Sequence, residues 1–315
     1  MNRHIKKYYF YLLGLYYDLF KRYDDAVEAY AEVMRYRFFF ANVQSKFSAA
    51  YKNRLSKSKL AITGGVGDFL QCLPYIMANK SNDYVVITHF PKAKEFFESF
   101  GIPICKIYTC TNPAEEKSIS QDVFSAEKVY RCPRDLFFKD SPLTSQAISY
   151  TSEHRPIIGV HMSSSHFAVS HEIKKGLTPK ALPKEFTVSL LNALEVLDFN
   201  VILFGTKKEI IDLGVAPNMR LKIASDDDIT KNLASVNSCH AFIGSDSAFK
   251  TMSSMLKIPT IVLYSKEKNN FRDRMFIDPY VKNGVIYPFR YQNFSDNEIN
   301  TAITFVTKTL TKLTR

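Results

Sequence analysis

The stretch AFIGSDSAFKTMSSMLKIPTIVLYS, residues 241–265, sets the fold class of this chain. Its first apolar run, AFI, predicts a buried strand. The polar turn GSDS at 244–247 follows and leads into a segment of helical length that ends near Lys257. A second apolar run, TIVLY, predicts the next parallel strand, so the order is strand, turn, helix, strand, as in a compact βαβ unit.

The turn at 244–247 has two interpretations. Ligands of open parallel sheets bind at the carboxyl edge, where free backbone N–H groups at a helix N-terminus suit phosphate. Asp246 and Ser247 would then face a ligand. Alternatively, either side chain only caps the helix, which is the common role of Asp and Ser there. The turn by itself favours the cap, so the rest of the chain has to decide.

Strand and helix patterns on both sides of the turn predict two lobes. Residues 58–155 contain the apolar runs KLAIT, DYVVITHF and IPICKIYTC, and the segment 111–155 that follows is polar and irregular in pattern. Residues 156–290 repeat the alternation with RPIIGVHM, NVILFG, RLKIAS and the opening stretch, and end in a loop-rich return. Each series is typical of a Rossmann-like α/β lobe with a parallel sheet. Two such lobes predict a ligand cleft between their facing carboxyl edges.

Residues 1–57 have a different pattern, which is helical, aromatic and basic, with no strand signal. Eight positions have the spacing of one tetratricopeptide repeat; they are Phe10, Leu13, Gly14, Tyr17, Tyr23, Ala26, Ala29 and Tyr30. An arbitrary amphipathic hairpin explains them equally well. The basic, phenylalanine-rich segment 35–54 suits either a membrane surface or a protein core. At the other end of the chain, residues 291–315 predict an amphipathic helix.

Composition limits the partners and the compartment. The 42 Lys+Arg exceed the 31 Asp+Glu by 11, which favours anionic partners such as nucleotide phosphates, an acidic lipid surface or nucleic acid. No interleaved aromatic and basic RNA motif stands out, so nucleic acid is not expected. The five cysteines lack the spacing of a disulfide framework or a zinc site. With no export signal and no apolar run of spanning length, we expect a cytoplasmic protein, peripheral to a membrane at most.

The first lobe has its own glycine-containing turn, TGGVGD at 63–68. The frame G-x-G-x-x-G fails at Leu70, and no Gly-Lys-Ser/Thr follows, so neither a dinucleotide site nor a P-loop is indicated. What remains is a permissive turn, with Gly65 and Gly67, that brings Asp68 to the start of a helix facing the cleft. Capping by Asp68 and catalysis by Asp68 are both compatible with this spacing.

Polar side chains of the second lobe gather at the carboxyl ends of its strands. They are Ser163, Ser164, Ser165, Lys180, Glu209, Asp246 and Ser247. Each of them alone suits a cap or a solvated surface, and their common location is what favours a site. The five-residue spacing of His161, His166 and His171 does not put them on one helical face, so no metal site and no metal cofactor are expected.

Taken in order, these motifs resemble glycosyltransferase family 9, typified by the bacterial ADP-heptose:lipopolysaccharide heptosyltransferases with the two-lobed GT-B fold. The resemblance covers roughly residues 59–271. The segments similar to the family's motifs are Gly67-Asp68-Phe69-Leu70, Leu73-Pro74, His161-Met162-Ser163-Ser164-Ser165, Lys180-Ala181-Leu182-Pro183, Gly205 with Glu209, Gly244-Ser245-Asp246-Ser247-Ala248, and Pro259-Thr260.

The resemblance implies a role for each matching residue. Asp68 would be the general base that takes the proton of an acceptor hydroxyl, and Glu209 would contact the donor's nucleoside. The diphosphate would be held by Lys180, by the serines at 163–165 and by the turn of Asp246 and Ser247. The family inverts the anomeric carbon without a metal, and a nucleotide-diphosphate sugar is its co-substrate.

Three departures fall in the donor lobe, where Ala248 replaces a signature glycine, Thr251 a histidine and Leu182 a tryptophan. They leave the donor open between ADP-heptose and another nucleotide sugar. The resulting expectation is a transferase that adds a sugar to a bacterial surface glycan such as lipopolysaccharide. The alternative is a GT-B-like scaffold that has lost catalysis and binds a protein partner through residues 1–57.

Overall fold

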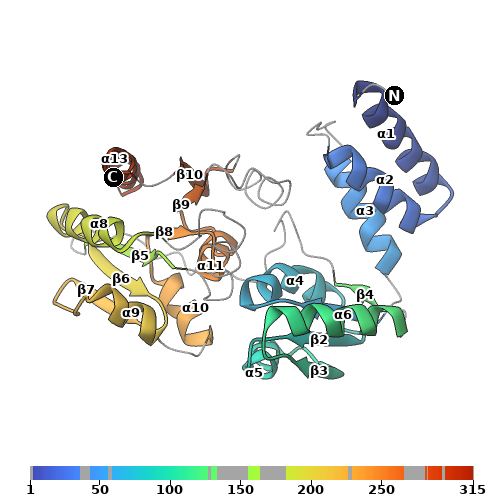
Figure 1. The fold of residues 1–315 in the computed structure, drawn as a ribbon, viewed down its shortest axis with the longest axis horizontal. Coiled ribbons are helices and arrows are strands. Elements are labelled where there is room, and N and C mark those ends of the chain that lie inside the picture. The colour runs from blue at the N-terminus through green and yellow to red at the C-terminus, as the bar shows by residue number, and fades with distance from the viewer. Residues whose placement is uncertain are drawn as a thin grey trace.

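The computed structural model describes residues 3–35, 43–55, 59–126, 129–132, 155–163, 182–225, 229–265, 281, 283–292 and 295–314. Within these ranges the chain forms a helical N-terminal segment and two parallel sheets covered by helices (Figure 1). The expected α/β class with two sheets is therefore confirmed.

The N-terminal segment consists of α1 (Arg3–Leu19), α2 (Tyr23–Arg35) and α3 (Val43–Leu55), with α2 packed against both of the others (Figure 1). Gly14 of α1 lies directly on the ring of Tyr30, since a Cβ at Gly14 would come within 2.5 Å of it. The absence of a side chain at Gly14 therefore lets the Tyr30 ring pack closely between α1 and α2. That the hairpin is a tetratricopeptide repeat stays a prediction.

The first sheet has the strand order β3-β2-β1-β4, and all its pairings are parallel. Its elements are β1 (Leu60–Thr63), α4 (Val66–Ala78), β2 (Tyr84–Thr88), α5 (Ala93–Ser99), β3 (Lys106–Thr109), α6 (Pro113–Ala126) and β4 (Tyr130–Arg131). Every residue of β2 is buried, as expected for a strand covered on both faces.

Residues 111–155 were expected to be irregular and to hold the remainder of the first lobe and a linker, and they begin instead with the regular elements α6 and β4, which belong to that lobe. Pro113 suits the first turn of a helix, where its missing N–H has no partner to lose. Asn112 just before it accepts from the N–H groups of Ala114 and Glu115 at 2.9 and 3.0 Å. Such an Asn-Pro start is a local helix signal that the polar composition of this segment hides.

The second sheet has the order β10-β9-β8-β5-β6-β7, again wholly parallel. Its elements are β5 (Ile157–His161), α8 (Lys184–Val196), β6 (Asn200–Phe204), α9 (Lys207–Leu213), β7 (Leu221–Ala224), α10 (Ile229–Asn237), β8 (Ala241–Ser245), α11 (Ala248–Met255), β9 (Thr260–Ser265), β10 (Ile286–Tyr291) and α13 (Asp296–Leu313). The loop-rich return expected before residue 290 is wrong for β10, which pairs with β9 along its whole length. Pro288 is tolerated there because β10 is an edge strand.

The two lobes meet through helices. α4 of the first lobe packs against α11 of the second, and α5 contacts α10. One cluster of buried apolar side chains runs through this junction, from Phe69 and Leu73 on α4 to Met252 and Leu256 at α11. The N-termini of α4 and α11, where the two polar turns lie, are therefore held at the contact between the lobes.

Candidate active site

Asp68 begins α4 and is held by the backbone of its own turn. Its Oδ2 accepts from the N–H of Gly65 at 3.0 Å. Gly64 has φ +108°, and a Cβ there would lie 2.1 Å from the same Oδ2, so the carboxylate needs a glycine at this position. Thr88 at the end of β2 donates to the carbonyl of Gly64 at 2.6 Å. The turn is thus fixed from both sides, and Asp68 is a capping residue that also lies at the sheet's carboxyl edge.

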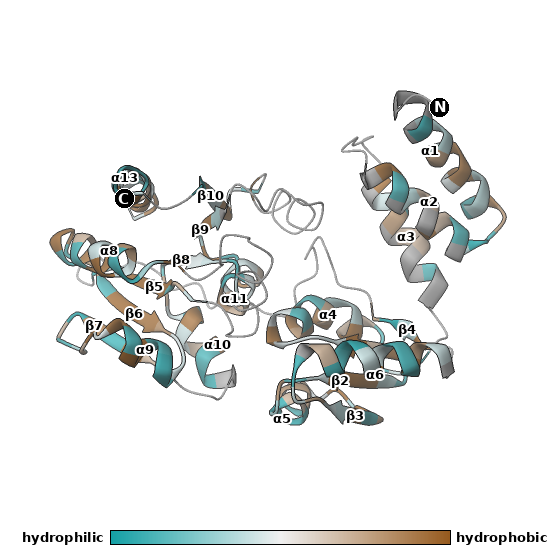
Figure 2. Cartoon of the chain, in the orientation of Figure 1, coloured by the Kyte–Doolittle hydropathy of each residue, from teal (hydrophilic) through white to brown (hydrophobic). Residues whose placement is uncertain are grey.

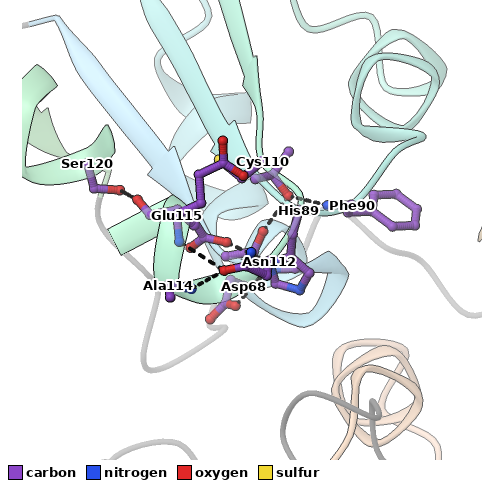
Figure 3. A network of polar contacts seen from close by, with 12 residues as sticks. Asp68, His89, Phe90, Cys110, Asn112, Ala114, Glu115 and Ser120 are labelled. Carbon is purple, nitrogen blue, oxygen red and sulfur yellow. Dashed lines mark hydrogen bonds and ion pairs between the residues drawn. The ribbon is translucent and has the colours of Figure 1, made fainter. Parts of the chain in front are cut away.

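His89 and Glu116 form an acid–base pair at the same edge of the sheet, and the sequence analysis named neither residue. His89 directly follows β2, and its Nδ1 lies 2.7 Å from Oε2 of Glu116 on α6. The two side chains are only 22% and 14% exposed. Figure 3 shows His89 beside Asp68. Because a first polar residue after a parallel strand lies at the same edge as the turns, the motif DYVVITH carried a usable signal.

Ser247 caps α11, accepting from the N–H of Lys250, and also contacts a buried histidine. His161, at the end of β5, lies with Nδ1 3.0 Å from the Ser247 hydroxyl, and its ring packs on Phe249 at 4.5 Å. Burial lowers the pKa of His161 to about 4, against the opposing effect of the Glu209 carboxylate. His161 is therefore neutral near pH 7 and serves as a hydrogen-bonding group rather than as a cation.

Asp246 in the same turn is ion-paired. Its Oδ1 accepts from Nζ of Lys250 at 2.7 Å, and the side chains are 21% and 8% exposed. Ser245 donates its hydroxyl to the carbonyl of Ser163 at 2.8 Å, which ties the end of β8 to the loop after β5. The turn at 244–247 is thus paired with a nearly buried cation, Lys250, to which the sequence analysis assigned no role.

Glu209 caps α9 instead of standing free. Its Oε2 accepts from the N–H of Thr206 at 2.6 Å, and the Thr206 hydroxyl accepts from the N–H of Glu209 at 3.2 Å. This reciprocal pair is a capping box. Gly205 lies against it, with a Cβ position 3.2 Å from the same carboxylate oxygen. Contact between Glu209 and a nucleoside stays a prediction.

The two turns meet at one point. A Cβ on Gly67 would lie 3.5 Å from Cα and 3.7 Å from Cβ of Ala248, so the first residues of α4 and α11 are in van der Waals contact. Asp68 is the next residue after Gly67, and Ser247 the one before Ala248. The structure therefore brings the turn that contains Gly67 and Asp68 into contact with the turn that contains Asp246, Ser247 and Ala248, whereas the sequence shows them as two separate motifs.

Gly65, Ser163, Gly205, Glu209 and Gly244 lie at strand or helix ends of the two sheets, as expected. Gly244 allows close packing in β8, since a Cβ there would be 2.9 Å from the carbonyl of His161. Ser164, Ser165 and Lys180 lie outside the described residues, as do His166 and His171. In the part of the chain that is described, no three His, Cys, Asp or Glu side chains cluster as metal ligands. All five cysteines are free thiols.

No protein-family model and no curated protein sequence matches the chain. Solved structures do. The E. coli ADP-heptose lipopolysaccharide heptosyltransferase II has a TM-score of 0.48 at 14% identity, covering 81% of this chain and 98% of its own. The E. coli heptosyltransferase WaaC with ADP gives 0.49 at 9% identity, covering 82% and 99%. A glycosyl transferase of family 9 from Veillonella parvula gives 0.44 at 11% identity, covering 78% and 89%.

The similarity is to heptosyltransferases. This is the family group that the sequence motifs resemble. Because all three TM-scores are below 0.5, the function proposed below rests on the residues and contacts of this chain.

Proposed function

We propose that this chain is an inverting, metal-independent glycosyltransferase that moves a sugar from a nucleotide-diphosphate sugar to a hydroxyl of a bacterial surface glycan, such as lipopolysaccharide. One observation carries the proposal, namely the contact between the two helix N-termini at Gly67 and Ala248. It sets a carboxylate from one lobe opposite a phosphate-compatible turn from the other, as a displacement at an anomeric carbon requires.

The reaction assigns a different task to each side. Asp68 takes the proton of the acceptor hydroxyl while the acceptor oxygen attacks the anomeric carbon. The bond from that carbon to the donor's phosphate oxygen breaks, and the nucleoside diphosphate leaves with the bonding electrons. The N–H groups at the start of α11 stabilise the negative charge that develops on the leaving phosphate, and Lys250 balances the charge of Asp246 in the same turn.

His89 supplies a second group on the acceptor side. Glu116 holds its Nδ1 at 2.7 Å, which fixes the orientation of the ring at the carboxyl edge of the first sheet. Nε2 is the nearest atom to the position of a Cβ on Gly65, at 4.0 Å, so this nitrogen faces the turn of Asp68. We assign His89 to acceptor positioning and Asp68 to proton removal.

The donor is ADP-heptose or a related nucleotide sugar, and the scaffold alternative is not favoured. A chain that had lost catalysis would not need both a glycine-dependent carboxylate in one turn and a nearly buried lysine in the other. We place the enzyme in the cytoplasm, where nucleotide sugars are made, and assign no cofactor to it.

The test is a panel of nucleotide sugars with different bases and sugars, added to the purified full chain without acceptor. We expect one donor class to raise the melting temperature and to be hydrolysed slowly to free nucleoside diphosphate, equally with and without a chelator. Absence of a response to every donor and every free nucleoside diphosphate would refute the proposal. Loss of hydrolysis on chelation alone would refute metal independence.

A further inference from the structure

Helix α1 has two apolar faces, and among the described residues only one of them packs against another helix. The inner face contains Gly14, which lies on the Tyr30 ring of α2, and Tyr11, whose ring lies 6.4 Å from the same ring. Tyr17 packs against the same small core. This face accounts for the folding of the hairpin. The opposite face takes no part in it.

The outer face is a continuous stripe of exposed apolar side chains. The described residues include eleven exposed large hydrophobic side chains, and six of them belong to this stripe. They are Tyr8 (47% exposed), Tyr9 (52%), Leu12 (63%), Tyr16 (53%), Leu19 (78%) and Phe20 (59%). At about 100° per residue they fall within roughly 120° of the helix circumference. Figure 2 shows apolar residues recurring along α1.

An apolar patch of this kind on a surface marks a binding face, and the charge around it selects the occupant. Residues 1–25 contain five Lys and Arg, at positions 3, 6, 7, 21 and 22, against three acidic residues, Asp18, Asp24 and Asp25, and Arg22 is ion-paired with Asp25 at 2.8 Å. A second copy of the chain would bring the same positive charge against this face in a two-fold contact. An anionic surface would meet complementary charge instead.

We propose that the outer stripe of α1 lies on an anionic lipid bilayer, with the helix axis in the membrane plane. Tyrosine and phenylalanine side chains suit the headgroup boundary, where one end is apolar and the other wet. Basic residues before and after the stripe attract acidic lipids. In the portion of the chain described, no helix is long and apolar enough to cross a bilayer, so the contact is one of lying on the surface. Of the two alternatives for the segment 35–54, Phe47 of α3 agrees with the protein core, since it packs against the helical cluster.

The chain has no tryptophan, so one introduced tryptophan reports on its own position. We expect Leu12→Trp to show a blue-shifted and stronger emission on addition of phosphatidylglycerol–phosphatidylcholine vesicles. Vesicles of phosphatidylcholine alone should change it little. The matched control is Met219→Trp, at a side chain 98% exposed in the second lobe, whose emission should stay unchanged.

The same surface is tested by loss of binding. In co-sedimentation with the anionic vesicles, Leu12→Asp with Leu19→Asp should weaken partition at least about tenfold, because charge replaces apolar area. Val196→Asp with Ile211→Asp, two side chains 85% and 75% exposed elsewhere, should leave it unchanged. Raised salt should weaken partition of the unaltered chain.

Three outcomes would overturn the proposal. They are no sedimentation of the full chain with anionic vesicles, equal sedimentation of the Leu12→Asp, Leu19→Asp variant, and a lipid-free dimer in sedimentation velocity that this variant abolishes. The last would assign the stripe to a second copy. None of these measurements uses a sugar donor, so they are independent of the proposed transferase activity.

Discussion

The two polar turns at the lobe junction are built on the same plan and hold their carboxylates differently. Asp68 accepts from a backbone N–H, in a turn that depends on the positive φ of Gly64. Asp246 accepts from the ammonium of Lys250, which is nearly buried. The ion pair of Asp246 with Lys250 adds little net charge to its turn, whereas the N–H of Gly65 brings no formal charge to Asp68. The first arrangement suits a base and the second suits a place for an incoming anion.

The largest expected effect comes from removing the charge of Asp68. Asp68→Asn should lower the rate of donor transfer or hydrolysis by about 10²–10⁴-fold, the usual contribution of a general base. The asparagine oxygen can still accept from the N–H of Gly65, so the melting temperature should change little. Steady-state kinetics and a thermal melt measure both quantities. The control is Asp122→Asn, at an exposed position of α6.

A rate within a few-fold of the unaltered enzyme would contradict the role of Asp68. His89 at the same sheet edge would then be the next group to test, because Glu116 holds it in a fixed orientation. If His89→Gln carried the loss instead, the proton would be taken by the histidine. If it only raised KM for the acceptor, the positioning role would stand.

The next largest effect comes from breaking the ion pair of Lys250 and Asp246 in the other turn. Lys250→Met keeps the length of the side chain but leaves Asp246 without its cation, and should lower the free energy of unfolding by about 3 kcal/mol. Adding Asp246→Asn should restore most of it, since the unpaired charge is then gone. Urea unfolding measures the three variants. The exposed Lys222→Met on β7 serves as control, and an equal loss there would mean that the pair contributes nothing specific.

The fold was predictable where apolar runs and turns alternate, and the site only in part. Five strands coincide with apolar runs that the sequence shows, namely β1, β2, β5, β6 and β8. α6 and β10 were missed, because the first is polar on much of its surface and the second is an edge strand with a proline. Asp68 and Asp246 were found from local motifs. The contact between their two turns depends on packing between elements that no local pattern encodes. The same is true of the pairing of His89 with Glu116 across 27 positions.

A smaller effect tests why the first turn needs glycine. Gly64→Ala should cost about 2 kcal/mol of unfolding free energy, from the positive φ and from the collision with Asp68. Gly101→Ala also has a positive φ, +62°, within the left-handed helical region, and its nearest heavy atom is 4.0 Å from the new Cβ, so it gives the smaller cost of a positive φ without a collision. Gly65→Ala has neither problem. Activity lost in Gly64→Ala beyond the loss in Gly101→Ala would show that Asp68 has been displaced.

The smallest effect is the pH dependence that His161, which contacts the second turn, gives to the free energy of unfolding. The pKa of His161 is lowered from 6.5 to about 4 by burial, so the unfolded chain binds more protons between these values. Stability attributable to His161 is therefore complete above pH 6.5 and falls as the pH drops toward 4. Between neutrality and about pH 5.5 the loss should be about 1 kcal/mol. Burial also lowers the pKa of His240, so the quantity to measure is the difference in slope between the unaltered chain and His161→Asn. Parallel curves of unfolding free energy against pH would mean that His161 does not titrate as a buried group.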